Sequence, residues 1–140
     1  MNLIEVTGGK KAERAIALET VEWCLKKLLP RHRTIDITVE FKANLDAFGY
    51  CMEEDAEGRI FTLTLKKGMG LFDLISTICH EMVHLKQYAR RELREVKGNT
   101  MWKKGVYNTV DYWDAPWEKE AYRLEKRLAV ECFQTMRVEV

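Results

Sequence analysis

The spacing of hydrophobic positions changes twice along the chain, and each change marks a different kind of element. After Gly8-Gly9, residues 10–29 carry apolar side chains at helical spacing, and Pro30 ends the segment. Residues 35–41 then alternate strictly between apolar and polar, which is typical of a strand with one buried face. We therefore expect the first ordered element to be a helix that begins at the glycine pair and is followed by a strand.

Two more strand candidates, residues 47–53 and 59–66, precede a return of the helical period. The polar stretch 54–58 between them ends in glycine, as the loop of a β-hairpin does. A second helix is predicted from residue 71 to about residue 93. Its apolar stripe consists of Leu71, Leu74, Ile75, Ile78, Met82 and Leu85. The neighbouring face, which we expect to look into a cleft, carries Asp73, Thr77, His80, His84 and Tyr88.

The last third of the chain shows less periodicity. Residues 101–113 are rich in aromatic side chains and predict irregular structure with at most a short strand. Asp114-Ala115-Pro116 is typical of a helix start, and the third helix is expected to span residues 116–136. Three helices around a small antiparallel or mixed sheet predict an α+β fold, and the length of 140 residues predicts a single domain over residues 1–140.

Charge and hydropathy restrict the partners that the protein is expected to have. The chain has 23 basic and 22 acidic residues, so its net charge of +1 gives no reason to expect direct nucleic-acid or membrane binding. No apolar run approaches the ~20 residues that span a bilayer, and the N-terminal residues do not form a signal peptide. We expect a cytoplasmic protein and, without an exposed heptad seam, a monomer.

The four cysteines do not form a metal-binding pair. They are too far apart for a C-x-x-C motif, and three of them fall inside expected helices or strands. We interpret them as reduced, structural thiols, which favours an intracellular setting. They are Cys24, Cys51, Cys79 and Cys132.

The candidate chemistry centres on the run His80-Glu81-Met82-Val83-His84 in the second predicted helix. Residues four apart lie on one helix face, so both imidazoles could bind one metal ion with Glu81 beside them. H-E-x-x-H is the signature of zinc metalloproteases, and a catalytic zinc site has three protein ligands and a water molecule. His32 precedes the motif and no histidine follows His84, which excludes the extended three-histidine pattern. A downstream carboxylate is therefore the expected third ligand.

Residues 116–122 resemble the second ligand-bearing helix of the gluzincin group of zinc metallopeptidases. In that group this helix follows an E-x-x-x-D or E-x-E-A-(D/N) pattern, in which the first glutamate binds zinc. The resemblance implies that Glu118 is the third ligand of a Zn²⁺ ion, with Glu120-Ala121 as the E-A pair. Tyr122 occupies the position at which the family has a residue that does not bind zinc itself but supports the zinc ligands. Glu120 remains an alternative ligand, and Asp111 a weaker one.

The resemblance extends to the whole layout of the chain. It implies a zincin-like fold with an N-terminal helix, a small sheet, the H-E-x-x-H helix and a C-terminal helix that carries the third ligand. Very small members of the group, the minigluzincins, and proteases of the ImmA/IrrE type that act on repressors are similar to it. Such proteins occur in bacteria and phages, so the chain could be virus-encoded. SprT-like proteases have a similar layout, but they resemble the three-histidine pattern that this chain lacks.

A zinc-dependent endopeptidase is the function that this resemblance implies. The metal, held by His80, His84 and Glu118, would lower the pKa of a water molecule, and Glu81 would act as the general base. The oxyanion needs a further hydrogen-bond donor, and we take Tyr112 as the first choice. The phenols available for this role are Tyr107, Tyr112 and Tyr122.

Two further segments have an expected role near the metal. In the gluzincin-like layout, strand 59–66 lies along the rim of the cleft and pairs with an extended peptide substrate, which requires a free strand edge. The aromatic residues between the two ligand helices either form a substrate wall or lid, or form a small core that fixes Glu118. These residues are Trp102, Tyr107, Tyr112, Trp113 and Trp117.

Two other functions are compatible with the same sequence. One is a binding module that the metal stabilises but that does no catalysis, in which Glu81→Gln would leave every cellular role intact. The other is a protease subunit that a DNA-associated partner directs to its substrate.

Overall fold

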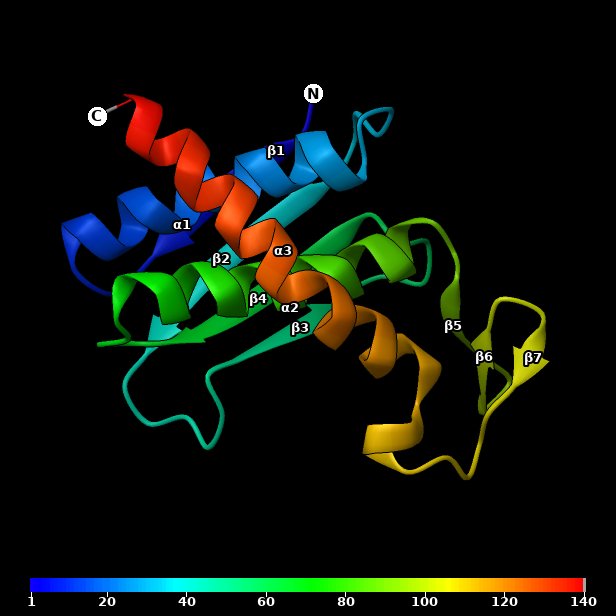
Figure 1. Cartoon of the computed structure of the whole chain (residues 1–140). Coiled ribbons are helices and arrows are strands. Elements are labelled where there is room, and N and C mark those ends of the chain that lie inside the picture. Colours follow the sequence, from blue (N-terminus) through cyan, green and yellow to red (C-terminus); the bar gives the residue numbers. More distant parts are fainter. Residues whose placement is uncertain (140) are drawn as a thin grey trace.

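Within residues 1–139, which the computed structural model describes, two α-helices lie against a four-stranded sheet, a third helix packs on these two, and a three-stranded sheet extends from one end (Figure 1). This arrangement confirms the expected α+β class. In chain order the elements are β1 (Leu3–Thr7), α1 (Lys11–Leu28), β2 (Asp36–Lys42), β3 (Gly49–Glu53), β4 (Ile60–Lys66), α2 (Leu71–Ala89), β5 (Leu93–Val96), β6 (Asn99–Trp102), β7 (Gly105–Val106), the 3₁₀ turn η1 (Tyr112–Asp114) and α3 (Pro116–Glu139).

The main sheet is mixed, with strand order β1-β2-β4-β3. β1, β2 and β4 are parallel, whereas β3 forms the predicted hairpin with β4 and lies antiparallel at the edge. The alternation in β2 and β4 places one set of side chains in the core, because successive residues of a strand point to opposite faces. The buried set consists of Ile37, Val39, Phe41, Phe61, Leu63 and Leu65.

The first ordered element is a strand, so the expectation that the glycine pair opens the ordered chain is wrong. β1 precedes the glycines and pairs in parallel with β2. Only Ile4 and Val6 of β1 pack against the core, which leaves too short an apolar pattern to stand out in the sequence. The side chain of Asn2 anchors the strand, because its Oδ1 accepts a hydrogen bond of 2.8 Å from the backbone N–H of Ile35.

α2 is the central helix of the molecule. Every residue from Leu74 to Gln87 is buried, because α2 lies between the main sheet and α3 and has α1 at its side (Figure 1). The helix ends at Ala89 rather than near residue 93. Arg91 adopts a φ of 60°, a left-handed conformation that terminates a helix, and the chain then enters β5.

The segment between α2 and α3 is more regular than its sequence predicts. β5, β6 and β7 form an antiparallel sheet, and two of its tight connections place Lys97 and Lys103 at positive φ. The irregular stretch is shorter than expected and ends in η1. α3 begins at Pro116 as predicted and continues to Glu139. Among the described residues, no helix combines the length and the apolar character that crossing a membrane requires.

Candidate metal centre

Three side chains from two helices converge on one point. His80 and His84 extend from α2, and Glu118 extends from the first turn of α3. The Oε1 atom of Glu118 lies 3.1 Å from Nε2 of His84 and 3.3 Å from Nε2 of His80. One potential ligand atom from each residue lies within 4.8 Å of the others, and within the described part of the chain this is the one such group of three or more.

The convergence follows from the packing of α3 on α2. The two histidines share a face of α2 because they are four residues apart. α3 buries an apolar face against the core, and the first buried residue of that face is Ala121. Glu118 lies three positions before Ala121, which is close to one helical turn, so it points in nearly the same direction. The buried residues are Ala121, Leu128, Ala129 and Cys132. This rotation of α3 turns Glu118 toward the histidines and turns its neighbour Lys119 to solvent.

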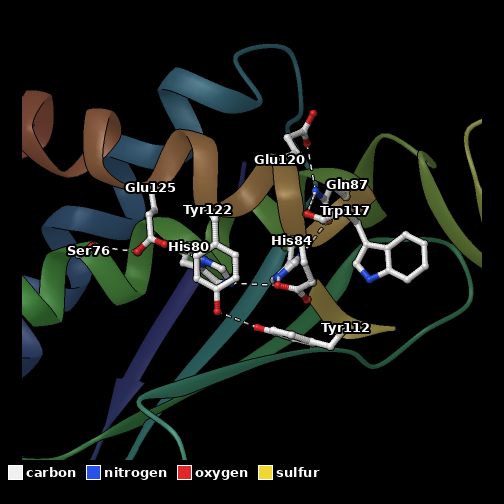
Figure 2. Close-up of polar contacts among 10 residues, drawn as sticks. Ser76, His80, His84, Gln87, Tyr112, Trp117, Glu120, Tyr122 and Glu125 are labelled. Atoms are coloured by element: carbon white, nitrogen blue, oxygen red, sulfur yellow. Dashed lines mark hydrogen bonds and ion pairs between the residues drawn. The ribbon is translucent and has the colours of Figure 1, made fainter. Parts of the chain in front are cut away.

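The side-chain amide of Gln87 forms a hydrogen bond with the ring of His84 and orients it. Nδ1 of His84 lies 2.9 Å from Oε1 of Gln87, and Nε2 of Gln87 donates to the carbonyl of Trp117 at 2.9 Å and to Glu120 at 3.0 Å (Figure 2). Glu120 also accepts from Lys86 at 2.8 Å. Glu120 therefore belongs to the supporting network, and Glu118 is the carboxylate that faces the histidines.

The ring of His80 has a carboxylate behind it that the sequence analysis missed. Oε1 of Glu125 lies 3.4 Å from Nδ1 of His80, and Oε2 accepts a hydrogen bond of 3.1 Å from Ser76 (Figure 2). Tyr122, on which the supporting position falls by comparison with the gluzincin pattern, instead packs its ring 4.6 Å from the ring of His80. Glu125 follows Glu118 by seven residues, two turns of helix, so helical periodicity was the signal that could have found it.

Two hollows adjoin one another at the face of α2 that carries His80. One has a volume of about 220 Å³ and the other of about 250 Å³, and they share His80, Glu81 and Tyr112. The first is also lined by Tyr50, Cys51, His84, Tyr88, Leu93, Trp117 and Glu118. The second is also lined by Phe48, Gly49, Thr77, Tyr122 and Glu125. The expected cleft face of α2 does look into these hollows at Thr77, His80, His84 and Tyr88.

The ionisable groups of the centre shift one another's pKa values. Burial alone would raise the pKa of Glu118, but hydrogen bonds and charge interactions with His80 and His84 lower it to about 2. Burial alone would lower the pKa of His84, but its contacts with Glu118 and Gln87 raise it above the ordinary value. Burial raises the pKa of Glu81, and the two histidines oppose that rise only in part. The raised pKa makes the Glu81 carboxylate more basic than an ordinary glutamate, which suits a proton acceptor.

Of the three phenols considered, two lie at the cleft. The hydroxyl of Tyr112 lies 2.9 Å from that of Tyr122 (Figure 2). Partial burial, the hydrogen bond to Tyr122 and the charge of Glu118 raise the pKa of Tyr112, so the phenol keeps its proton at neutral pH. Tyr107 packs edge-on against Trp117, outside the two hollows. A further phenol, that of Tyr50, lines the first hollow from β3, although no sequence pattern marks it.

The aromatic segment between the ligand helices divides into two groups. Trp102 and Tyr107 lie 6.2 Å and 6.1 Å from Trp117, measured between ring centroids, and form a small cluster at the start of α3. Tyr112 and Trp113 pack against one another at 4.9 Å beside the cleft. The first group packs at the start of the helix that carries Glu118, and its Trp117 also lines the first hollow, whereas in the second group Tyr112 lines both hollows.

The strand predicted to receive a substrate is the wrong one. β4 pairs with β2 on one edge and with β3 on the other, so residues 59–66 offer no free edge. The edge position belongs to β3, whose Gly49, Tyr50 and Cys51 line the hollows. A Cβ at Gly49 would lie 2.9 Å from Cγ2 of Thr77, so glycine allows β3 to approach α2 closely.

Asp111 and Cys79 do not join the centre. Asp111 is exposed and is absent from the converging group. Cys79 is fully buried, with its Sγ 3.8 Å from Sγ of Cys24 in α1, and it lines neither hollow. Its thiol is free, as are those of the other three cysteines.

Comparisons of the chain with family models, with curated proteins and with solved structures returned no match.

Proposed function

We propose that the protein is a zinc-dependent endopeptidase with a gluzincin-like active site and a zincin-like fold. The observation that carries the proposal is the joint placement of His80, His84 and Glu118 with Glu81 in an open cleft. Three ligands and an adjacent carboxylate base are the parts that metal-assisted hydrolysis of an amide needs. Each part comes from a position that the H-E-x-x-H motif or the E-x-E-A segment predicts.

The donor set fits zinc. Two imidazole nitrogens and one carboxylate oxygen are ligands that Zn²⁺ favours, and three protein ligands leave a position open. The second ring nitrogen of each histidine faces a hydrogen-bond acceptor, Oε1 of Gln87 for His84 and Oε1 of Glu125 for His80. Such partners fix the tautomer in which Nε2 carries no proton and is free to bind a metal.

The chemistry divides between the metal and the side chains of the cleft. Zinc, when bound, lowers the pKa of a water molecule and polarises the scissile carbonyl. Glu81 takes up the proton as the water attacks and returns it to the departing amine. Its raised pKa makes the carboxylate a better proton acceptor than an exposed glutamate. Tyr112 lines both hollows and its raised pKa keeps the phenol protonated, which supports its proposed role as the hydrogen-bond donor to the oxyanion.

The substrate is an extended peptide segment. β3 is an edge strand beside the cleft, and an edge strand binds an extended chain through main-chain hydrogen bonds. A segment that pairs in this way must be unfolded or flexible in the target protein. The free edge of β3 thus takes the role that the sequence analysis assigned to residues 59–66.

Zinc content and turnover together test the proposal. Purified wild type is expected to hold one zinc per chain by elemental analysis, and Glu118→Ala clearly less. Glu81→Gln is expected to keep the metal and to lose peptide hydrolysis by a factor of at least about 10³. Hydrolysis is followed by mass spectrometry on a mixture of unstructured peptides, which detects cleavage at any position of each peptide.

The same experiment separates the alternatives. Full zinc with no hydrolysis by wild type would replace the endopeptidase by the metal-stabilised binding module. Full zinc in Glu118→Ala would move the third ligand to another carboxylate. No zinc in either protein, even after zinc is added back, would remove the basis of the proposal.

A further inference from the structure

Glu125 contributes a carboxylate to the second hollow, which has no lysine or arginine in its lining. Its side chain is 16% exposed, and its carboxylate contacts His80 and Ser76. Within the described part of the chain, no lysine or arginine lies in ion-pair distance of Glu125, and none lines the hollow. Buried charges in proteins are usually paired, so a largely buried carboxylate at the wall of a cleft is a position for a cation.

Metal binding does not remove this excess charge. A divalent ion at the centre offsets two of the three carboxylate charges of Glu81, Glu118 and Glu125. One negative charge then remains, and of the three carboxylates Glu125 is the one that lines the second hollow but not the first. The second hollow is therefore electrostatically suited to a positively charged group, whereas the first hollow continues into the apolar and aromatic side chains of Leu93 and Trp117.

The walls of the second hollow fit the stem of a long basic side chain. Phe48, Tyr112 and Tyr122 line the hollow and have exposed fractions of 54%, 51% and 42%. Aromatic faces pack well against the methylene groups of lysine and arginine and also attract the charged end. The hollow has a volume of about 250 Å³.

We propose that the second hollow binds a lysine or arginine side chain of the peptide substrate, adjacent to the scissile bond, with Glu125 as its counterion. This inference rests on the proposed endopeptidase function. Glu125 can accept the additional hydrogen bond because a carboxylate has about four acceptor positions, and His80 and Ser76 use two of them. It thus acts both as the residue that orients His80 and as the residue that determines specificity.

Matched peptides test the charge requirement. The set consists of alanine-based octapeptides with one lysine, or one norleucine of similar length without the charge, at each of the four central positions. For zinc-loaded wild type, we expect the best lysine peptide to be cleaved with a kcat/KM at least 10-fold higher than that of its norleucine counterpart. In Glu125→Gln, which keeps an acceptor for His80 and loses the charge, the ratio is expected to fall to about 2 or less.

A binding measurement separates this inference from the proposed function. The zinc-loaded Glu81→Gln protein is titrated with the same peptides, with and without Glu125→Gln. We expect the lysine peptide to bind at least 5-fold tighter than the norleucine peptide only when Glu125 is present. Glu131→Gln is the control, because Glu131 is a carboxylate of α3 that pairs with Lys27 away from the cleft. Zinc content is measured for every variant, so that loss of metal is not mistaken for loss of specificity.

The outcomes point in different directions for the two proposals. A lysine preference in binding that Glu125→Gln abolishes supports the cation subsite even when no peptide is cleaved, in which case only the endopeptidase function fails. Cleavage and binding without a lysine preference, or a preference that survives Glu125→Gln, would overturn the cation subsite and leave the endopeptidase function standing.

Discussion

Glu125 lies behind His80, with its Oε1 atom 3.4 Å from the imidazole Nδ1, although Glu125 follows the ligand position Glu118 by two helical turns. When Nε2 of His80 faces a metal, the proton of the neutral ring is on Nδ1. The Glu125 carboxylate can accept a hydrogen bond from this N–H group. In the proposed zinc site, Glu125 thus takes the supporting role that the gluzincin pattern gives to the residue four positions after the ligand. A tyrosine occupies that closer position and packs on the ring instead.

Loss of this support is expected to weaken metal binding. Glu125→Ala should lower zinc affinity by a factor of about 10–100, which is the usual effect of removing a partner that orients a ligand. Glu125→Gln should retain most of the affinity because its amide oxygen can still accept the Nδ1 proton. Competition with a chromophoric chelator measures both variants, with Glu131→Ala as the surface control. Equal affinities for Glu125→Ala and wild type would show that the contact does not orient His80.

Gln87 connects the second histidine to α3. Gln87→Leu keeps the volume of the side chain but leaves His84 Nδ1, the Trp117 carbonyl and one hydrogen bond of Glu120 without their partner. We expect a loss of about 3 kcal/mol in the free energy of unfolding, because buried polar groups become unsatisfied. Urea denaturation measures the loss. Gln134→Leu on the exposed face of α3 should change it by less than about 0.5 kcal/mol.

Gly49 controls how closely the edge strand approaches the cleft helix. The Cβ of Gly49→Ala would meet Thr77 Cγ2 at 2.9 Å and the carbonyl oxygen of Thr64 at 3.1 Å. We expect a loss of about 1–3 kcal/mol in unfolding free energy from overpacking. Adding Thr77→Ser removes the closest contact and should restore part of the loss, as a double-mutant cycle would show. Gly70→Ala, with no atom within 4 Å of its Cβ, should cost about 1 kcal/mol or less. Simple additivity of Gly49→Ala and Thr77→Ser would exclude the steric explanation.

The Glu118 contacts make the stability of the metal-free protein depend on pH. The pKa of Glu118 is lowered from 4.5 to about 2, so this group stabilises the fold above pH 4.5 and loses its effect as pH falls toward 2. The pKa of His84 is raised above 6.5, so its contribution is complete below pH 6.5 and disappears as pH rises through the raised value. Wild type should therefore exceed Glu118→Gln in stability most clearly between pH 4.5 and 6.5.

The expected difference in that window is on the order of 2 kcal/mol. It is measured by urea denaturation of both proteins in the presence of a chelator at pH 3, 5.5 and 8.5. A difference that stays constant across the three pH values would contradict a role for the ionised pair.

Local geometry made part of this protein predictable from its sequence. His80 and His84 must share a helix face because four residues complete about one turn, whatever surrounds the helix. Strict alternation likewise predicted β2, since the period of two is a property of the strand itself, and the polar loop that ends in Gly58 predicted the hairpin of β3 with β4. Pro116 predicted the start of α3 for a similar reason, because its fixed φ suits the first turn.

Other features depended on contacts between distant parts of the chain. Glu118 and Glu120 lie two positions apart on one helix, and only the rotation of α3 against α2 directs the first to the histidines and the second to Lys86. Helical spacing permits Glu125 to reach His80, but the crossing of the two helices makes the contact. The order of the strands is also determined by pairing between distant segments, and it gives the free edge to β3 instead of β4. Sequence patterns therefore determined which chemical groups are present and on which faces, and tertiary packing decided which of them meet, because contact requires a distance that local periodicity does not set.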